Sequence, residues 1–415
     1  MKRHGACFFV LLGLLLYARL PAQDSLDWDI DSIFDEPLPD TPSDVTEDAG
    51  FSPMSLVRRR GFTFDASFDF LAGLAPGWDE APWFSAEDSG FSWGPGVRMK
   101  TNFGLDAQIS EVFRVKTSIN FQIPDFSFNL GDFFFDYTMF DKVFFRGGKY
   151  GLSWGISPNF GFTNLLSRVP KDSDPGPSFI FKADVPIGVG GIQALALTRA
   201  KLIEGAEVTR RDIGFGGKCN FALRWVDLDI GAFYQEEMPV RAFFSIKTTI
   251  GKTELYNEWL AVFDKNQPNE VNGAANLGFI QNFFNDKLIV NGELFLNAEG
   301  DTYWYRPETS LQEAGTSSFI EGLNLTLNLM YRFGGIGNPR LFLQTRYAPL
   351  QESALLIPGF ILSPWSNIEL YLALPMGLGS RDGYYYSHTA NLNNRPFSVV
   401  FLLTLKGSVQ AGYYY

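Results

Sequence analysis

The chain has 415 residues, of which 46% are hydrophobic and 19% are charged, and its formal net charge is −12. This acidic balance argues against a nucleic-acid partner, because proteins that bind nucleic acids carry basic patches. Once the predicted signal peptide, residues 1–22, is removed, one cysteine and one histidine remain, which are too few for a zinc site, and no CxxC, HExxH or P-loop motif occurs. We therefore expect no metal and no cofactor.

The N-terminus has the three parts of a secretory signal peptide. Lys2 and Arg3 precede an apolar run that is too short to cross a membrane comfortably, and LPAQ then supplies a cleavage region. We expect residues 1–22 to be removed on export; the alternative is an uncleaved anchor. The mature chain then keeps one cysteine, Cys219, which excludes an intramolecular disulfide, and one histidine, His388.

Residues 23–57 form an acidic segment. Between Asp24 and Gly50 the chain carries ten Asp or Glu and no Lys or Arg. This composition, with several prolines and no sustained periodicity, predicts a disordered segment in the periplasm. It acts either as a solubilising linker or, through the stretch DWDIDSIF, as a docking motif for a periplasmic partner.

From residue 58 to residue 415, apolar and polar residues alternate again and again. The clearest case is EGLNLTLNLMYRF at residues 321–333, where four leucines at odd positions alternate with Asn324, Thr326 and Asn328. A period of two predicts a β-strand. In a soluble sandwich the leucines would point into the core, whereas in a membrane barrel they would face lipid and the amides would face a pore.

The lengths of the strands and of their connections favour the barrel. The predicted strands run to about ten residues, the length that a tilted strand needs to cross a bilayer, where soluble strands average about 5–6. Short turns alternate with mostly longer loops, and the short ones fall near residues 110–112, 140–142, 190–191, 226–227, 251–252, 284–287, 334–338 and 363–366. The longer ones fall near residues 72–97, 153–177, 200–212, 264–273, 299–320, 348–355 and 376–395. This pattern indicates short turns on one rim and long loops on the other.

We therefore predict an all-β fold, a transmembrane antiparallel up-and-down β-barrel over residues 58–415. It has about 18 strands, with 16 as the alternative, and the disordered acidic tail precedes it. Two strands are doubtful: in 127–139 the alternation slips by one residue, and in 355–362 Pro358 and Gly359 interrupt it. An even number of strands places both termini at the rim of the short turns.

The sequence ends LKGSVQAGYYY, in alternation and with a terminal aromatic residue, Tyr415. With the pattern of residues 60–415, this ending resembles that of porin-type barrels of the bacterial outer membrane. The Phe-rich composition is also similar to that of spirochaete outer-membrane proteins. The resemblance is one of architecture, without a residue-level motif. It implies a Gram-negative outer membrane, contact with its lipid, and recognition of the last strand by the barrel-assembly machinery.

The polar face of each strand is expected to line a water-filled lumen, because a barrel of this size is too wide for side chains to fill. Hairpin register should place Asp106 opposite Lys116 and Arg224 opposite Asp229. It should also place Ser245 opposite Glu258 and Thr249 opposite Glu254, which leaves Lys247 diagonal to both carboxylates. The predicted pore-lining residues are Arg98, Lys100, Asp106, Arg114, Lys116, Arg224, Asp229, Lys247, Glu254, Glu258, Asn324, Asn328, Arg332 and Arg346.

Four of these residues, Arg98, Lys100, Arg114 and Lys116, lie on adjacent predicted strands, and only Lys116 directly faces an acid. They predict a basic patch that would favour anions.

The leading functional hypothesis is a porin-like channel that lets small hydrophilic solutes diffuse through a charged lumen. The alternative is a surface structural or adhesion barrel with a plugged pore, whose long loops bind an external partner. A remote alternative is a barrel enzyme that acts on lipid. His388, in a predicted exposed loop, does not supply the spaced nucleophile and base that such an enzyme needs, so we expect no enzyme and no catalytic residues.

Overall fold

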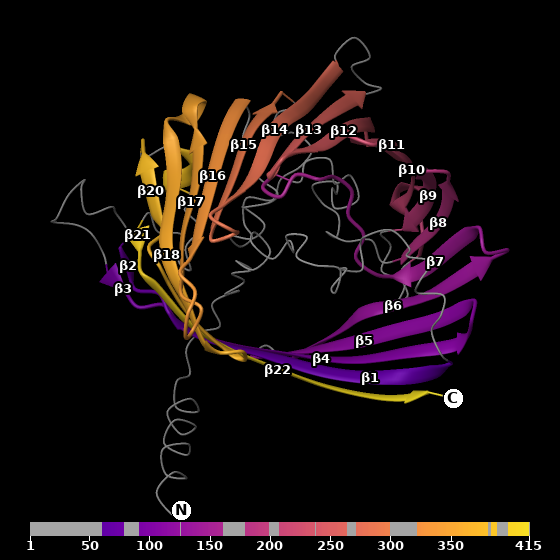
Figure 1. Cartoon of the computed structure of the whole chain (residues 1–415), viewed down its shortest axis with the longest axis horizontal. Helices are drawn as coiled ribbons and strands as arrows, with labels where there is room; N and C mark the ends of the chain where they lie inside the picture. Colours follow the sequence, from indigo (N-terminus) through magenta and orange to yellow (C-terminus); the bar gives the residue numbers. More distant parts are fainter. Residues whose placement is uncertain are drawn as a thin grey trace, which may run out of the picture.

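The computed structural model describes residues 60–78, 91–124, 126–160, 179–198, 207–236, 238–263, 271–298, 322–380, 383–387 and 397–414. Within these residues, eighteen antiparallel strands form one closed barrel (Figure 1). The predicted signal peptide, residues 1–22, and the acidic segment, residues 23–57, lie outside the described residues. No helix in the described part of the chain is long and apolar enough to cross a membrane.

The barrel strands follow one another around the wall in chain order. They are β1 (Gly61–Leu74), β4 (Pro95–Ser110), β5 (Phe113–Ile123), β6 (Ser127–Met139), β7 (Val143–Lys149), β8 (Phe179–Ile187), β9 (Gly190–Thr198), β10 (Ile213–Ala222), β11 (Asp227–Gln235), β12 (Val240–Ile250), β13 (Thr253–Phe263), β14 (Val271–Phe283), β15 (Leu288–Asn297), β16 (Gly322–Arg332), β17 (Arg340–Ala348), β18 (Ser353–Trp365), β19 (Ile368–Ala373) and β22 (Val400–Tyr414).

Short elements extend the wall at the rim of the long loops. They are β2 (Gly77–Trp78), β3 (Phe91–Ser92), β20 (Met376–Gly379), β21 (Phe397–Ser398), the 3-10 turns η3 (Arg210–Asp212) and η4 (Pro349–Gln351), and the single helical turn α4 (Tyr384–Ser387). β2 pairs with β3 and β21, and β20 pairs with β18 and β21, so the sheet continues beyond the main barrel strands.

The first and last strands close the barrel. β1 pairs with β22 from Gly61 opposite Tyr414 to Leu74 opposite Phe401. On the outer surface of this seam the rings of Phe62 and Tyr413 lie 5.8 Å apart, centroid to centroid. Gly61 also faces Gln108, close to the turn between β4 and β5, so both ends of the barrel lie at the rim of the short turns, as predicted.

The two faces of each strand differ in the way that the alternation predicts. In β16, Asn324 and Asn328 are buried, with 1% and 4% of their surface exposed, whereas Leu327 between them is 39% exposed. The leucines therefore lie on the outer surface and the amides point inward. Large apolar side chains are exposed in the same manner on strands all round the barrel, among them Phe64 in β1, Phe215 in β10 and Trp259 in β13.

Both doubtful strands form. In β6 the register against β5 jumps between Thr117 and Ile119, so Gly131 and Asp132 make a bulge, and the Asp132 N–H donates to the Ser118 hydroxyl at 2.7 Å. A bulge adds one residue to a strand, which is the slip in alternation that the sequence shows. β18 runs through Pro358 and Gly359. The count of eighteen is therefore right.

Some connections differ from the prediction. The turn expected at 190–191 lies at 188–189, and the one expected at 226–227 lies at 223–226. Residues 348–355, which we predicted as a longer loop, contain only the turn η4 before β18 begins at Ser353. Turn positions depend on backbone geometry that the period-two pattern leaves open by one or two residues.

We predict that Leu327→Arg lowers the free energy of unfolding by about 2–4 kcal/mol, because it places a charge in hydrocarbon at the middle of β16. Urea unfolding of the barrel in lipid vesicles measures this. The matched control is Asn129→Arg, on an inward polar position of β6, where we expect a change within about 0.5 kcal/mol. Equal losses for both variants would contradict the assignment of the two faces.

Candidate functional site

The inner surface of the barrel has one polar and two apolar regions. The polar wall is formed by inward side chains of β22, β1, β4, β5 and β6. One apolar cluster spans β6 to β15 and includes Phe134, Leu195, Phe233, Phe243, Leu260 and Phe295. The other spans β17, β18, β19, β22 and β1 and includes Leu71, Phe342, Ile357, Ile361, Tyr371 and Leu402. A hydrophilic solute therefore meets favourable groups mainly on the polar wall.

The first apolar cluster is covered by an inner segment, residues 150–160. It leaves β7, passes inside the ring of strands and reaches β13, β15 and β16 (Figure 1). Two aromatic side chains anchor it. Phe160 stacks on Phe295 with ring centroids 4.6 Å apart, and the ring centroids of Trp154 and Phe243 lie 5.7 Å apart. Burial of such rings is a large apolar contribution to stability. The sequence predicted residues 153–177 as an outer loop, so its described part, residues 153–160, is a correction.

Two buried carboxylates on the wall bind this segment. Glu258 is fully buried and accepts hydrogen bonds from the backbone N–H of Ile156, at 2.8 Å, and of Ser157, at 3.2 Å. Glu293 is 4% exposed and accepts from the Ser157 hydroxyl at 2.5 Å and the Asn159 amide at 3.0 Å. Buried carboxylates need such donors, because desolvation of an unbonded acid is costly.

Amide groups complete the attachment. Asn159 donates to Asn291 at 3.1 Å and accepts from Asn328 at 2.7 Å. On the wall itself, Asn276 and Tyr256 also donate to Glu293, at 2.6 and 3.1 Å. The segment is thus held by a connected network of hydrogen bonds from four successive strands, β13 to β16.

The charged residues of the wall form ion pairs across strands. Arg114 donates to Asp106 through its Nε at 2.8 Å and lies 3.7 Å from Asp136, to which Arg146 donates at 2.7 Å. The guanidinium of Arg146 also lies 4.4 Å from the ring centroid of Phe134. The chain of alternating charges therefore runs over β4, β5, β6 and β7.

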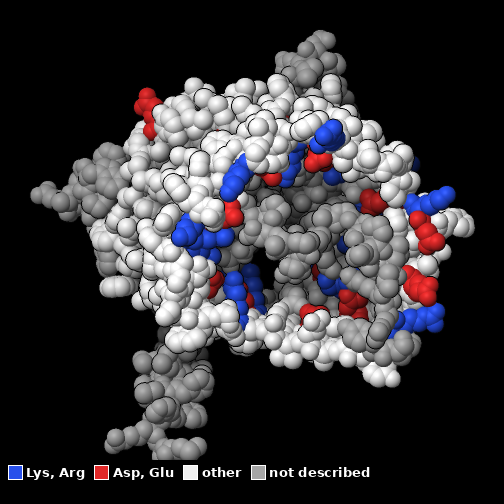
Figure 2. Space-filling view, in the orientation of Figure 1, with Lys and Arg blue, Asp and Glu red and all other residues white. Residues whose placement is uncertain are grey.

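Further pairs continue this pattern around the barrel. Three of them join different strands: Lys218 with Asp229 at 3.2 Å, Lys247 with Glu254 at 2.7 Å and Arg340 with Glu369 at 2.6 Å. The fourth, Lys182 with Asp184 at 2.9 Å, lies along β8. Figure 2 shows both signs of charge around the inner edge of the central hollow, whereas much of the outer surface carries none.

Two of the three predicted pairings are correct. Asp106 lies opposite Lys116, but its bidentate partner is the diagonal residue Arg114, so Arg114 is not part of an uncompensated basic patch. Glu254 and Glu258 lie where predicted, opposite Thr249 and Ser245, and Lys247 pairs with Glu254. The carboxylate of Glu258, however, binds the inner segment instead.

The third pairing is wrong. Asn220, and not Arg224, lies opposite Asp229. Arg224 is in the turn at 223–226, exposed, with its guanidinium 4.9 Å from the ring centroid of Trp225. The reason is the turn itself, which takes four residues where two were assumed.

The other predicted residues fall into separate places. Asn324 and Asn328 are buried in β16, and Asn328 donates to Asn159 of the inner segment. Arg346 hydrogen-bonds the buried Tyr385 of α4. Arg332 ends β16 opposite Arg340. Arg98 and Lys100 lie on β4, with Leu71 and Asp69 opposite them on β1. The prediction that only Lys116 directly faces an acid is therefore wrong, because β1 pairs with β4 and brings Asp69 opposite Lys100.

The sequence analysis missed several residues of the ion pairs and of the hydrogen-bond network that holds the inner segment. Asp136 was hidden by the parity slip in β6, and Arg146 lies in the next strand, β7; the polar character of both residues in alternating strands was a usable signal. Glu293, Asn159 and Trp154 had no such signal, because the contacts between the inner segment and the wall join residues far apart in the chain.

Among the described residues, no group of three or more His, Cys, Asp or Glu is placed to hold a metal ion.

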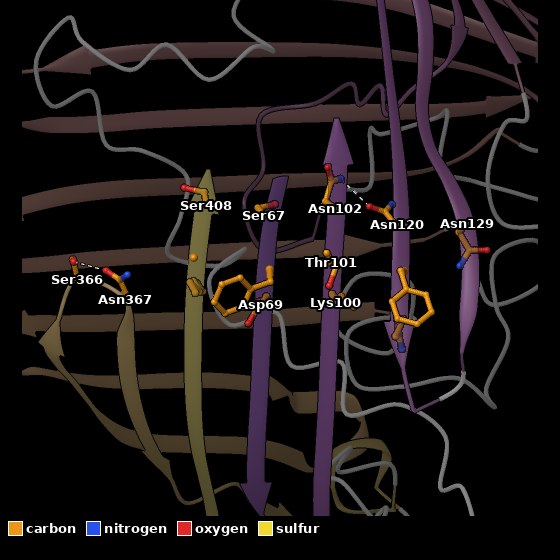
Figure 3. Close-up of a pocket in the computed structure, with 15 residues that line it drawn as sticks. Ser67, Asp69, Lys100, Thr101, Asn102, Asn120, Asn129, Ser366, Asn367 and Ser408 are labelled. Atoms are coloured by element: carbon orange, nitrogen blue, oxygen red, sulfur yellow. Dashed lines mark hydrogen bonds between the residues drawn. The ribbon is translucent and has the colours of Figure 1, made fainter. Parts of the chain in front are cut away.

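The polar wall borders a hollow of about 700 Å³ (Figure 3). Ser67, Asn102, Asn120 and Asn129 line it from β1, β4, β5 and β6, and Lys100 lines it one step further along β4. Its size falls in the range of about 300–1,000 Å³ that is usual for sites of small molecules.

Comparison with known proteins gives structural likeness only. No protein-family model matches the chain, and no curated protein matches it in sequence. Among solved structures, OccD3 (OpdP) of Pseudomonas aeruginosa has a TM-score of 0.52 at 8% identity, over 86% of this chain and 97% of that one. OpdQ of the same organism has a TM-score of 0.51 at 8% identity, over 84% and 98%. OccAB2 of Acinetobacter baumannii has a TM-score of 0.50 at 10% identity, over 83% and 98%.

At these identities the likeness shows the fold. A closed antiparallel barrel of this size, with an apolar outer face, is a barrel of the outer-membrane type, because closure leaves no unpaired strand edge in hydrocarbon. The predicted location in an outer membrane and the architectural resemblance to porins are therefore confirmed.

We predict that Asn159→Ala loosens the inner segment, because Asn159 loses its bonds to Asn291, Glu293 and Asn328. Loss of partners in a buried network costs about 1–3 kcal/mol for each group left unbonded. Hydrogen exchange of the backbone amides of Ile156 and Ser157 should quicken. The control is Asn102→Ala on the opposite polar wall, which should leave these two rates unchanged. If Asn159→Ala leaves both rates unchanged, the network does not hold the segment.

Proposed function

We propose that the chain is a porin-like channel through which small hydrophilic solutes diffuse across the outer membrane. The observation that carries this proposal is the hollow of about 700 Å³ beside the polar wall, inside a barrel whose outer face is apolar. Figure 2 supports it, since an opening is visible inside the ring of strands and charged groups lie around its edge.

Transport through such a channel needs no chemical step. Solute and ions exchange part of their hydration shell for polar side chains of the wall, and opposed charges set the preference for one sign of ion. The inner segment occupies one side of the lumen against β12 to β16, so the passage is narrowed toward the polar wall. The ion pairs keep the wall hydrated without a large excess of either charge.

We assign the predicted lining residues to the passage, the inner segment or an exposed turn, except Asn324, which is buried in β16. Arg98, Lys100, Asp106, Arg114, Lys116, Asp229, Lys247, Glu254, Arg332 and Arg346 are proposed to border the passage. Glu258 and Asn328 hold the inner segment instead, through Ile156, Ser157 and Asn159, and Arg224 belongs to an exposed turn.

The orientation in the membrane follows from the two ends of the barrel. Because Gly61 and Tyr414 lie at the rim of the short turns, residues 23–57 are proposed to lie in the periplasm. There they act as a linker or contact a periplasmic partner. The last strand, β22, is proposed to be the part read by the barrel-assembly machinery.

Single-channel recording of the refolded protein in planar bilayers tests the channel. We expect a stable ohmic conductance and passage of small neutral solutes in a liposome-swelling assay. A correctly folded barrel that conducts no ions and passes no solute would favour the plugged adhesion barrel.

We predict that the double variant Arg98→Gln/Lys100→Gln shifts the reversal potential toward cation preference at low salt. The shift should nearly vanish at 1 M salt, where the screening length is about 3 Å. Arg114 is left unchanged, because its removal would release Asp106 and Asp136. The control Lys252→Gln, in an exposed turn, should have a much smaller effect at either salt concentration. If the double variant keeps its reversal potential at low salt, these two side chains do not border the passage.

A further inference from the structure

One row of side chains on the polar wall carries no charge. Ser408, Ser67, Asn102, Asn120 and Asn129 lie opposite one another on the adjacent strands β22, β1, β4, β5 and β6. Figure 3 shows the five at the same height, facing the hollow. We call these five residues the amide row. Neighbouring strands are about 4.8 Å apart, so the row spans about 19 Å.

Most of the hydrogen-bonding capacity of the row faces the hollow. Within the described residues, its side chains make one hydrogen bond, from Asn102 Nδ2 to Asn120 Oδ1 at 2.8 Å. Asn129 and Ser408 are exposed to the lumen, and the other three are half-buried. Each amide carries two donor hydrogens and an acceptor, and each hydroxyl can donate and accept. A ligand with several groups that both donate and accept would match this surface.

The charges beside the row largely offset one another. One step along the strands, Asp69 lies between Lys406 and Lys100, directly opposite both. The Nζ of Lys406 also lies 3.8 Å from Glu369. Glu369 also pairs with Arg340 at 2.6 Å, and Asp65 lies one inward position from Ser67 on the other side of the row. Three basic groups therefore lie near three acidic groups, which leaves little net field to attract an ion of either sign. The local charge favours a neutral ligand over an anion.

We propose that the amide row is a binding station for neutral polyhydroxylated solutes, such as sugars and polyols. This inference rests on the proposed channel, because the row faces its lumen. Successive hydroxyls of the solute would bond to successive amides and serines, and the hollow of about 700 Å³ has room for a disaccharide. Each bond replaces one to water, so binding is weak enough for the solute to leave again.

The test uses sucrose as the probe and the double variant Asn102→Ala/Asn120→Ala. Equilibrium dialysis of the refolded barrel in detergent measures sucrose affinity without any ion current. We expect the variant to bind sucrose about tenfold more weakly, because two or more hydrogen bonds are lost. The matched control is Gln410→Ala, an inward position on β22 outside the lining of the hollow, which should keep its affinity. Far-UV circular dichroism checks that both variants fold.

Current recordings test the sucrose-binding station and the channel independently of each other. In the unmodified protein, sucrose should interrupt the single-channel current, and in the double variant the interruptions should become shorter while conductance in KCl stays nearly the same. Current without sucrose binding would overturn the station and leave the channel standing. Sucrose binding without current would support the station and overturn the channel.

The competing hypothesis is an anion-binding site at Lys100 and Lys406. If gluconate binds more tightly than sucrose, and Lys100→Gln/Lys406→Gln abolishes that binding, the neutral-solute proposal is wrong. Equal sucrose affinity in the unmodified protein and the double variant would also overturn it. A gluconate affinity at or below that of sucrose supports it.

Discussion

The need to pair every backbone N–H and C=O group inside hydrocarbon governs this structure. An unpaired group in the bilayer core costs several kcal/mol, so a sheet that crosses the membrane has to close on itself. The seam between β1 and β22 provides this closure over fourteen consecutive pairs, from Gly61 with Tyr414 to Leu74 with Phe401. Once the register of the seam is fixed, every side chain is committed to lipid or to the lumen, because a slip of one residue would exchange the two faces.

Closure at eighteen strands creates a space that side chains of the wall do not fill. Besides the apolar cluster of β17, β18, β19 and the adjoining parts of β22 and β1, the inner surface takes two forms. Over β6 to β15 the wall turns apolar side chains inward, and the inner segment covers them with Trp154 and Phe160. Over β22 to β6 the wall is polar, and it borders the hollow. The asymmetry of the lumen is therefore a property of the inner surface, and the outer surface is apolar all round.

The charges of the lumen are arranged by register more than by composition. Across antiparallel strands, directly opposite and diagonal side chains come within reach of one another, so most basic groups meet an acid. Arg114 illustrates this, with its two neighbours Asp106 and Asp136 on either side strand. A wall built in this way stays hydrated and carries little net charge at any one place. The amide row differs from this charged part of the wall because its five side chains carry no charge.

The alternation of polar and apolar residues by itself determined most of the strands and their two faces, and it narrowed their number to 18 or 16. It did so because the side-chain period of a strand is local and repeats with each residue pair, and even the bulge at Gly131 and Asp132 was visible as a slip in parity. Tight turns such as 251–252 fixed hairpin register equally well, as the pairing of Ser245 with Glu258 demonstrates. Where the turn was longer, at 223–226, the same reasoning misplaced Arg224.

Only the tertiary structure decided what the lumen contains. The hydrogen bond from Ile156 to Glu258 joins residues 102 positions apart, and no local pattern specifies where such a segment will lie. The same holds for the amide row, whose five members come from four separate stretches of sequence and the last strand. They become neighbours only because the barrel closes. Local periodicity fixes which way a side chain points, whereas its partners depend on the path of the whole chain.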